Sequence, residues 1–235
     1  MNAFTGKTVY VTGAAGNLGQ AVVQKFLDND ACVIALDLNE DLLKSTYPNK
    51  PQQLSTYAVD LLDRPVLVAL FDRLASDGHT ADVLCALTGG FYMGDPVHAT
   101  PTDKLELMFQ LNVHTLVNSV AAAVPHMRQN GGGKIVTVGA NAALHGISGM
   151  GAYCASKSAV MKLTESMSAE LKTDGFNVNG VLPSIIDTPQ NRAAMPGADP
   201  KNWVSPESLA DVICHLSSDA ARDIHGALVP VTGLS

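Results

Sequence analysis

The sequence predicts an α/β fold: a single domain with a doubly wound, seven-stranded parallel sheet and helices on both faces. Short apolar segments alternate with longer segments of helical periodicity along the whole chain. Two apolar segments, Val33–Leu36 and Ile135–Val138, are hydrophobic at almost every position, which is typical of strands covered on both faces. No repeat, low-complexity tract or Pro/Gly linker divides the 235 residues, so we expect one domain over 1–235.

The elements follow from these patterns in order along the chain. The expected strands are Thr8–Thr12, Cys32–Asp37, Leu54–Val59, Asp82–Leu87, Lys134–Val138, Asn177–Leu182 and Leu228–Val231. The expected helices, which connect the parallel strands, are Leu18–Asn29, Arg64–Ser76, Thr102–Gln129 with a bend near Pro125, Met150–Lys172 and Pro206–Ser218. The segment 183–205 holds four prolines and two asparagines, so we expect an irregular loop. Because it follows the carboxyl end of a strand, it is the expected substrate-binding loop.

Composition narrows the function classes. A net charge of −7 without blocks of like charge disfavours nucleic acid and anionic membranes as partners. The N-terminus lacks the apolar core of a signal peptide, and the longest apolar-rich stretch, Leu116–Met127, is too short to span a bilayer. The four cysteines and seven histidines are scattered without metal-site spacing, which predicts free thiols and no metal. We therefore expect a soluble, cytoplasmic protein that acts on a small molecule.

A glycine-rich turn between the first strand and the first helix predicts a dinucleotide site of the Rossmann type. Glycines let the backbone approach a pyrophosphate, which the helix N-terminus stabilises. The residues expected to contact the cofactor here are Gly13, Ala15, Gly16, Asn17, Leu18 and Gly19. Asp37, at the end of the second strand, can accept hydrogen bonds from ribose hydroxyls, although an ordinary turn aspartate remains the alternative. No Arg or Lys stands at Ala14, Ala15 or Leu38 to pair with a 2′-phosphate, so NAD(H) is preferred over NADP(H).

Tyr153 and Lys157 stand four residues apart on an expected helix, which brings both side chains to one face. A neighbouring ammonium stabilises a phenolate, so this pair is expected to lower the phenol pKa towards the working range of an acid–base catalyst. The spacing alone is a weak signal, because it arises by chance in many helices.

In combination, the glycine-rich turn, Asp37, Asp60-Leu61, Asn112 and the Tyr153/Lys157 pair resemble the short-chain dehydrogenase/reductase family over essentially the whole chain. The resemblance implies that Tyr153 transfers the proton, that Lys157 holds the nicotinamide ribose and tunes Tyr153, and that Asn112 organises a water-linked proton relay. It also implies cofactor contacts from Leu38, Asp60, Leu61, Thr88, Gly89, Gly90, Pro183, Ile186 and Thr188, with Asp60 and Leu61 beside the adenine.

One departure from the family pattern concerns the substrate. The family usually places a serine thirteen residues before the tyrosine, where it polarises a carbonyl, and this chain has Ala140 there. The Asn141 amide can replace that serine only in part, and the loss of such a donor typically weakens transition-state stabilisation by several kcal/mol. An ordinary ketone is therefore expected to be a poor substrate.

Three segments, 139–144, 149–153 and 182–203, resemble the dihydropteridine reductase branch of the family. The branch resemblance implies NADH-dependent reduction of a quinonoid dihydropterin, an acceptor activated enough to need no serine. Phe91 then offers an aromatic face to a flat heterocycle. The residues expected to bind substrate are Phe91, Ala140, Asn141, Tyr153 and Asn191.

Two other functions remain open from the sequence. One is a general short-chain carbonyl reductase or alcohol dehydrogenase, and the other is a catalytically silent dinucleotide sensor. The resemblance further implies a homodimer or homotetramer that associates through the two long helices, where Ala121–Ala123 would allow close contact, although alanines pack equally well inside a monomer. The natural substrate, the stereochemistry and the physiological direction are not fixed by the sequence.

Overall fold

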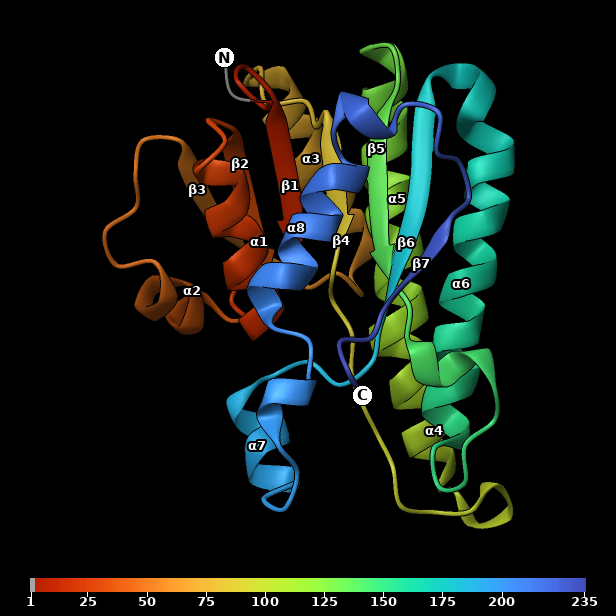
Figure 1. Cartoon of the computed structure of the whole chain (residues 1–235). Coiled ribbons are helices and arrows are strands. Elements are labelled where there is room, and N and C mark those ends of the chain that lie inside the picture. The colour runs from red at the N-terminus through yellow and green to blue at the C-terminus, as the bar shows by residue number, and fades with distance from the viewer. Residues whose placement is uncertain (1–2) are drawn as a thin grey trace.

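The computed structural model of the chain describes residues 3–235 and contains one seven-stranded sheet (Figure 1). The strands β1 to β7 are Thr8–Thr12, Cys32–Asp37, Leu54–Ala58, Val83–Ala86, Gly133–Val138, Phe176–Pro183 and Leu228–Val231. They lie in the order β3-β2-β1-β4-β5-β6-β7, and every neighbouring pair is parallel. The predicted α/β class with a seven-stranded parallel sheet is confirmed, and no strand end differs from its prediction by more than one residue.

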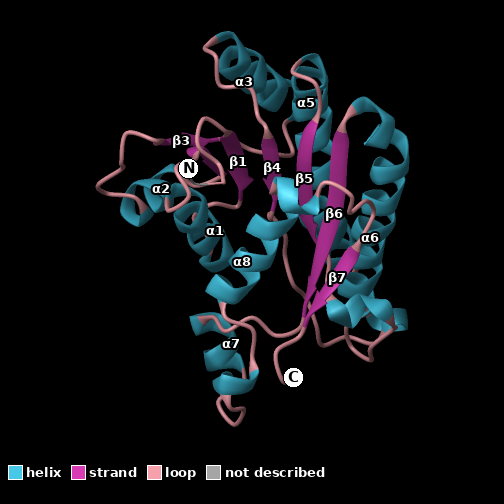
Figure 2. Cartoon of the chain, turned by 45° about the horizontal axis from the view of Figure 1, so that its top comes forward, coloured by secondary structure: helices cyan, strands magenta, loops and turns pink. Residues whose placement is uncertain are grey.

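Helices cover both faces of the sheet (Figure 1, Figure 2). On one face pack α1 (Asn17–Leu27) and α8 (Pro206–Leu216), which contact each other, and on the other pack α3 (Arg64–Ser76), α5 (Thr115–Gln129) and α6 (Gly151–Leu171). From β1 the chain adds β2 and β3 on one side and then β4 to β7 on the other, so the strand order reverses between β1 and β4. A crevice at such a reversal, outside the carboxyl ends of the strands, is where ligands bind in open α/β sheets.

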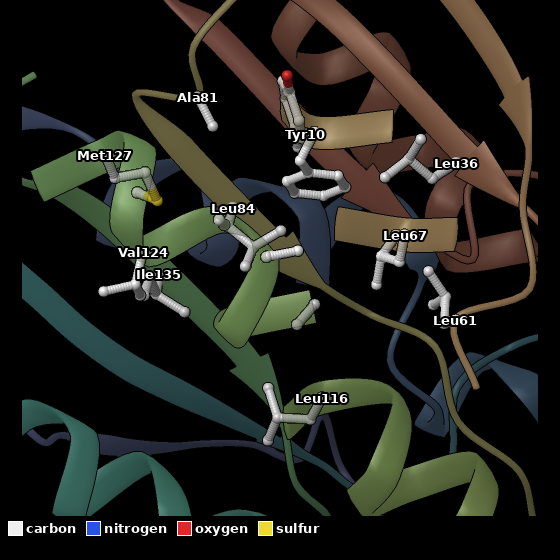
Figure 3. Close-up of a cluster of buried hydrophobic side chains, with 14 of the residues drawn as sticks. Tyr10, Leu36, Leu61, Leu67, Ala81, Leu84, Leu116, Val124, Met127 and Ile135 are labelled. Carbon is white, nitrogen blue, oxygen red and sulfur yellow. The ribbon is translucent and has the colours of Figure 1, made fainter. Parts of the chain in front are cut away.

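Each face of the sheet has its own hydrophobic core. Successive residues of β1 alternate between the faces: Tyr10 joins the cluster under α3 and α5, whereas Val9 and Val11 join the cluster under α1 and α8. In Figure 3, Tyr10, Leu36 and other strand residues point towards helix residues of the first cluster. Burial on both faces explains why the strands are almost continuously hydrophobic in sequence.

Two helices occur where none was predicted. Asn39 caps α2 (Glu40–Thr46) by accepting a hydrogen bond from the Leu42 amide at 2.9 Å, but only Leu43 of this helix is buried, so the sequence carries almost no apolar periodicity. Thr188 caps α7 (Pro189–Ala194), a helix without any buried residue. The segment 183–205 is therefore only partly irregular, and its expected lack of structure was wrong over α7.

The predicted helix Thr102–Gln129 is interrupted, but not at Pro125. It consists of α4 (Thr102–Phe109), a π-helical turn at Gln110–His114, and α5, which continues through Pro125. Wide turns of this kind occur frequently at functional sites, and this one carries Asn112.

The same 28-residue stretch is the one helix among residues 3–235 that could cross a membrane by length and apolar composition, and 44% of its most apolar window is buried inside the protein. Core helices of soluble proteins pass this test too, so the finding is weak evidence for a membrane. Ala122 and Ala123 are buried in the core under α3 and α5, and only Ala121 is partly exposed. Ala122 and Ala123 therefore pack within the chain, which was the alternative left open for them, and only Ala121 remains partly available for contact between subunits.

The expected absence of a signal sequence falls partly on Met1 and Asn2, which lie outside the described residues.

Candidate active site

The glycine-rich turn between β1 and α1 is shaped by two glycines. Gly13 adopts φ +65°, in the left-handed region, and a Cβ on Gly19 would lie 2.2 Å from the Gly13 carbonyl oxygen. The helix can begin this close to the turn only because position 19 has no side chain. Gly16 stands before the helix, and no side chain caps the amides of its first turn, so they remain donors for an anion at the positive end of the helix dipole.

Asp37 joins the second strand to this turn. One of its carboxylate oxygens accepts a hydrogen bond from the Ala15 amide at 3.0 Å, and the other accepts a longer one from the Asn39 amide at 3.4 Å. Besides its expected contact with a ribose, the Asp37 carboxylate therefore stabilises the glycine-rich turn. Tyr47, which the sequence argument missed, donates its hydroxyl to the Ala14 carbonyl at 2.7 Å.

Asp60 and Leu61, which are expected beside the adenine, differ in exposure. Leu38 and Asp60 are exposed, and Asp60 accepts a hydrogen bond from the Leu62 amide at 2.8 Å. The Leu61 side chain instead points into the core, as Figure 3 shows. Its carbonyl accepts a hydrogen bond from the Asn118 amide at 2.9 Å.

Asn112, on the π-helical turn, holds the loop that follows β4. Its side-chain oxygen accepts from the Gly90 amide at 2.9 Å, and its nitrogen donates to the Gly90 carbonyl at 3.2 Å and to Ser156 Oγ at 2.9 Å. A Cβ on Gly89 would lie 2.6 Å from Asn112 Oδ1 and 3.0 Å from Lys157 Nζ. The loop after β4, the π-helical turn and α6 therefore converge at Gly89.

Tyr153 and Lys157 both lie in the first two turns of α6, but their charges are not coupled as expected. The Lys157 ammonium is buried and donates to the Val138 carbonyl at 2.8 Å, and burial lowers its pKa to about 8. Burial also raises the pKa of Tyr153 to about 12. The predicted lowering of the phenol pKa is therefore wrong for the free protein, because desolvation dominates both groups.

The substrate side of Tyr153 is apolar. Ala140 is 2% exposed and packs with Ala143, Met161 and Leu182, and Tyr153 packs against this small cluster. Asn141 begins a short 3₁₀ turn, is half-buried, and makes no side-chain hydrogen bond to any residue that the structure describes. Its amide is thus available to a ligand.

Phe91 stands next to Tyr153. The ring centroids are 4.9 Å apart with an interplanar angle of 73°, an edge-to-face contact, and Phe91 remains 57% exposed. An exposed aromatic face therefore lies beside the phenol.

The segment 183–205 reaches back to the glycine-rich turn. Asn17 donates its side-chain amide to Gln190 of α7 at 3.0 Å, although the two residues are 173 positions apart. Thr188 caps α7, and Asn191 donates its side-chain amide to the Ile186 carbonyl at 2.8 Å, so these predicted ligand-binding residues also stabilise the segment. Pro183 is buried at the end of β6.

The chain end braces the base of this segment. Ser184 donates to the Thr232 carbonyl at 2.7 Å and lies 2.8 Å from Ser235 Oγ, while the Leu234 amide donates to the Asn202 carbonyl at 2.9 Å. Sequence reasoning missed these contacts and Gln190, because hydrogen bonds between distant exposed residues leave no local pattern.

The four cysteines are free, and residues 3–235 contain no group of three or more His, Cys, Asp or Glu side chains placed to hold a metal ion.

The chain is similar to known proteins in sequence and in fold. The family model for short chain dehydrogenases matches residues 7–198. The cis-4-hydroxycyclohexanecarboxylate dehydrogenase of Sinomonas cyclohexanicum is 29% identical over 241 residues, covering 98% of this chain and 97% of that enzyme.

Two solved structures share the fold at 22% identity, each covering 99% of this chain and 98% of its own: carveol dehydrogenase from Mycobacterium avium in complex with NAD, with a TM-score of 0.90, and ElxO with NADP bound, with a TM-score of 0.89. The comparisons support the family and the fold; they do not single out the dihydropteridine reductase branch.

Proposed function

Because this chain belongs to the short-chain dehydrogenase family, we propose that it is an oxidoreductase that uses NADH to reduce an activated, planar acceptor such as a quinonoid dihydropteridine. The observation that carries the choice of acceptor is Ala140. A buried methyl group stands where the family pattern has a carbonyl-polarising serine, so the site favours acceptors that need no polarisation.

The residues around the carboxyl ends of β1 and β4 fit a dinucleotide. Gly13 and Gly89 leave space that a Cβ would fill, and the first amides of α1 carry no side-chain cap. The turn Gly13–Gly19 would hold the diphosphate and Asp37 the adenosine ribose. When bound, the nicotinamide supplies the hydride.

NADH is the proposed form of the cofactor because Asp37 repels a 2′-phosphate and no cation stands at Ala14, Ala15 or Leu38 to offset that repulsion. Similar structures hold NAD or NADP, so a direct comparison of the dissociation constants for NADH and NADPH is needed. We expect the wild type to bind NADH at least tenfold more tightly.

Tyr153 acts as the proton donor. With a pKa raised to about 12 in the free protein, its phenol is protonated at neutral pH and so carries the proton that the reduced acceptor takes up. Lys157, fixed by the Val138 carbonyl, would hold the nicotinamide ribose, and Asn112 positions Gly89 and Gly90 while its turn supports the proton relay. Phe91 offers its exposed face to the flat acceptor, and we expect the segment 183–205 to bind the acceptor from the other side.

The test is NADH oxidation with freshly generated quinonoid dihydropterin beside a panel of ketones and alcohols. We expect turnover of the pterin and poor turnover of ketones, with Tyr153→Phe lowering kcat by at least a hundredfold while NADH binding is retained. Ala140→Ser is the matched variant: it should improve ketone reduction and leave pterin reduction nearly unchanged.

A second candidate is a general carbonyl reductase or alcohol dehydrogenase, in which Asn141 replaces the serine. It is favoured by the free Asn141 amide and by the alcohol dehydrogenases among the relatives. Ketone turnover without pterin turnover would select it. Tight NADH binding with no turnover of either class would instead indicate a sensor.

A cytoplasmic location, expected from the sequence pattern, and a homodimer or homotetramer, implied by the family resemblance, also belong to this proposal.

A further inference from the structure

Two loops at the carboxyl ends of the strands carry a group of exposed apolar side chains. One loop follows β4 (residues 91–99) and the other leads into α6 (residues 140–150); in Figure 1 both lie at the lower right, with α7 at the lower left. Phe91, at the start of the first loop, contacts Tyr153. The exposed side chains, which we call the apolar rim, are Phe91 (57% exposed), Met93 (57%), Val97 (77%), Leu144 (47%) and Ile147 (42%).

The two loops are joined to each other and to the start of α6. The Gly94 amide donates a hydrogen bond to the Gly149 carbonyl at 2.8 Å. A Cβ on Gly151 would lie 2.6 Å from Val97 Cγ2, so Val97 packs directly against the first residue of α6. Because Tyr153 stands two residues further along this helix, the apolar rim is continuous with the surroundings of the phenol.

The loops that carry the apolar rim have little charge. Segments 91–99 and 140–150 contain no Lys or Arg, and their one acidic residue, Asp95, accepts a hydrogen bond from the Tyr92 hydroxyl. His98 and His145 are the other titratable side chains of the two loops besides Tyr92. An apolar group placed on this surface is stabilised by its removal from water, whereas a charged group would lose hydration without gaining a partner.

We propose that the acceptor carries an apolar substituent that lies on the apolar rim, and that it is an alkyl-substituted quinone. The inference rests on the proposed function: the activated, planar ring lies between Ala140 and Phe91, and the substituent extends beyond it. A quinone needs no polarising serine, and its ring has oxygen acceptors only. A dihydropterin also brings N–H donors, which would need partners beside the apolar rim.

The groups of the proposed site balance this reaction. The quinone takes up a hydride from NADH and the phenol proton of Tyr153, so that both C=O groups become C–OH groups and NADH becomes NAD⁺. Two electrons and two hydrogens are transferred in total. Solvent then returns a proton to Tyr153.

The experiment measures NADH oxidation with two forms of one quinone. The first is dimethoxy-methyl-benzoquinone, and the second carries a single isoprene unit at the free ring position; both rates are corrected for the reaction without protein. We expect kcat/KM of the wild type to be about tenfold higher for the isoprenyl form, a gain that corresponds to roughly two methylene groups removed from water.

The double variant Met93→Gln/Ile147→Asn makes the apolar rim polar at two exposed positions. We expect the gain from the isoprene unit to fall below about twofold, while the Tm stays within about 2 °C because neither side chain is buried. Val66→Asn is the matched control, since Val66 is an apolar side chain of similar exposure (52%) on α3, outside the apolar rim. It should keep the tenfold gain.

Three results would overturn the proposal: equal kcat/KM of the wild type for both quinones, a tenfold gain that persists in the double variant, or reduction of the quinonoid dihydropterin with reduction of neither quinone. A double variant that loses activity equally on both quinones and shifts its molecular mass in light scattering would also overturn it, because the apolar rim would then be a contact between subunits. If neither the quinones nor the dihydropterin are reduced, the proposed function itself is wrong.

Discussion

Lys157 is a buried cation that forms no ion pair with any of the residues 3–235, and its charge should make folding stability depend on pH. In the folded chain it loses its proton near pH 8, whereas the unfolded chain retains the ordinary value of 10.5. Between these values the unfolded state binds the extra proton, so the contribution of Lys157 to stability rises with pH; below pH 8 both states are protonated and the contribution is constant.

Lys157→Met removes the titrating group and serves as the reference for this prediction. We expect the free energy of unfolding of the wild type to gain about 2 kcal/mol on the variant between pH 7 and 9.5, from about 1.4 kcal/mol per pKa unit. Urea unfolding of both proteins at several pH values measures this difference. A difference that stays flat over this range would mean that Lys157 has an ordinary pKa in the folded protein.

Gly89 is where the lack of a side chain matters most for the candidate site. In Gly89→Ala the new methyl group would meet Asn112 Oδ1 and Lys157 Nζ, so we expect the free energy of unfolding to fall by about 1–3 kcal/mol and kcat to fall with it. Gly146→Ala is the control, because nothing lies within 4 Å of its Cβ position, and its change should stay below about 0.5 kcal/mol. Equal effects in urea unfolding of the two variants would contradict the predicted collision.

Individual site residues were predictable to different degrees. The sequence placed Gly13, Asp37, Tyr153 and Lys157 near the carboxyl ends of the strands because turn, strand end and helix spacing are local patterns. It could not give the direction of the Leu61 side chain or the pKa of Tyr153, since both depend on which atoms surround the residue after folding.

At the scale of elements, the sequence predicted those helices and strands whose buried residues recur at a regular spacing. The strands and the helices α1, α3, α6 and α8 bury one face or both, and their patterns are clear. The helices α2 and α7 bury one residue and none, so only their capping residues marked them. The π-helical turn has no sequence signature that separates it from the helix on either side.

α7 is held to the glycine-rich turn by the Asn17–Gln190 hydrogen bond, so it should slow the release of a bound cofactor. Loss of one exposed hydrogen bond in Gln190→Ala is expected to raise the dissociation rate of NADH about twofold to threefold in stopped-flow fluorescence. Lys201→Ala, an exposed change on the same segment, should leave that rate unaltered. Equal rates for wild type and Gln190→Ala would show that α7 does not restrain the cofactor.

At the scale of the whole molecule, the sequence predicted a doubly wound parallel sheet, but it could not establish the number of subunits. Leu105, Leu107 and Val117 are exposed on α4 and α5, on the helices that the family resemblance assigns to subunit contact. Exposed apolar side chains favour association, since it removes them from water.

We therefore expect a homodimer or homotetramer at micromolar concentration in light scattering. Val117→Glu, which puts a charge at a position that is 40% exposed, should shift the protein towards the monomer while its Tm changes little. A monomeric wild type would contradict this expectation.

The bracing of the segment 183–205 by the last residues of the chain has a practical consequence. Figure 1 places the C-terminal end close to the connection that leads to α7. Because Ser235 lies 2.8 Å from Ser184 Oγ, a fluorophore attached after Ser235 would sense movements of the proposed substrate segment. A purification tag attached there would strain the same contacts.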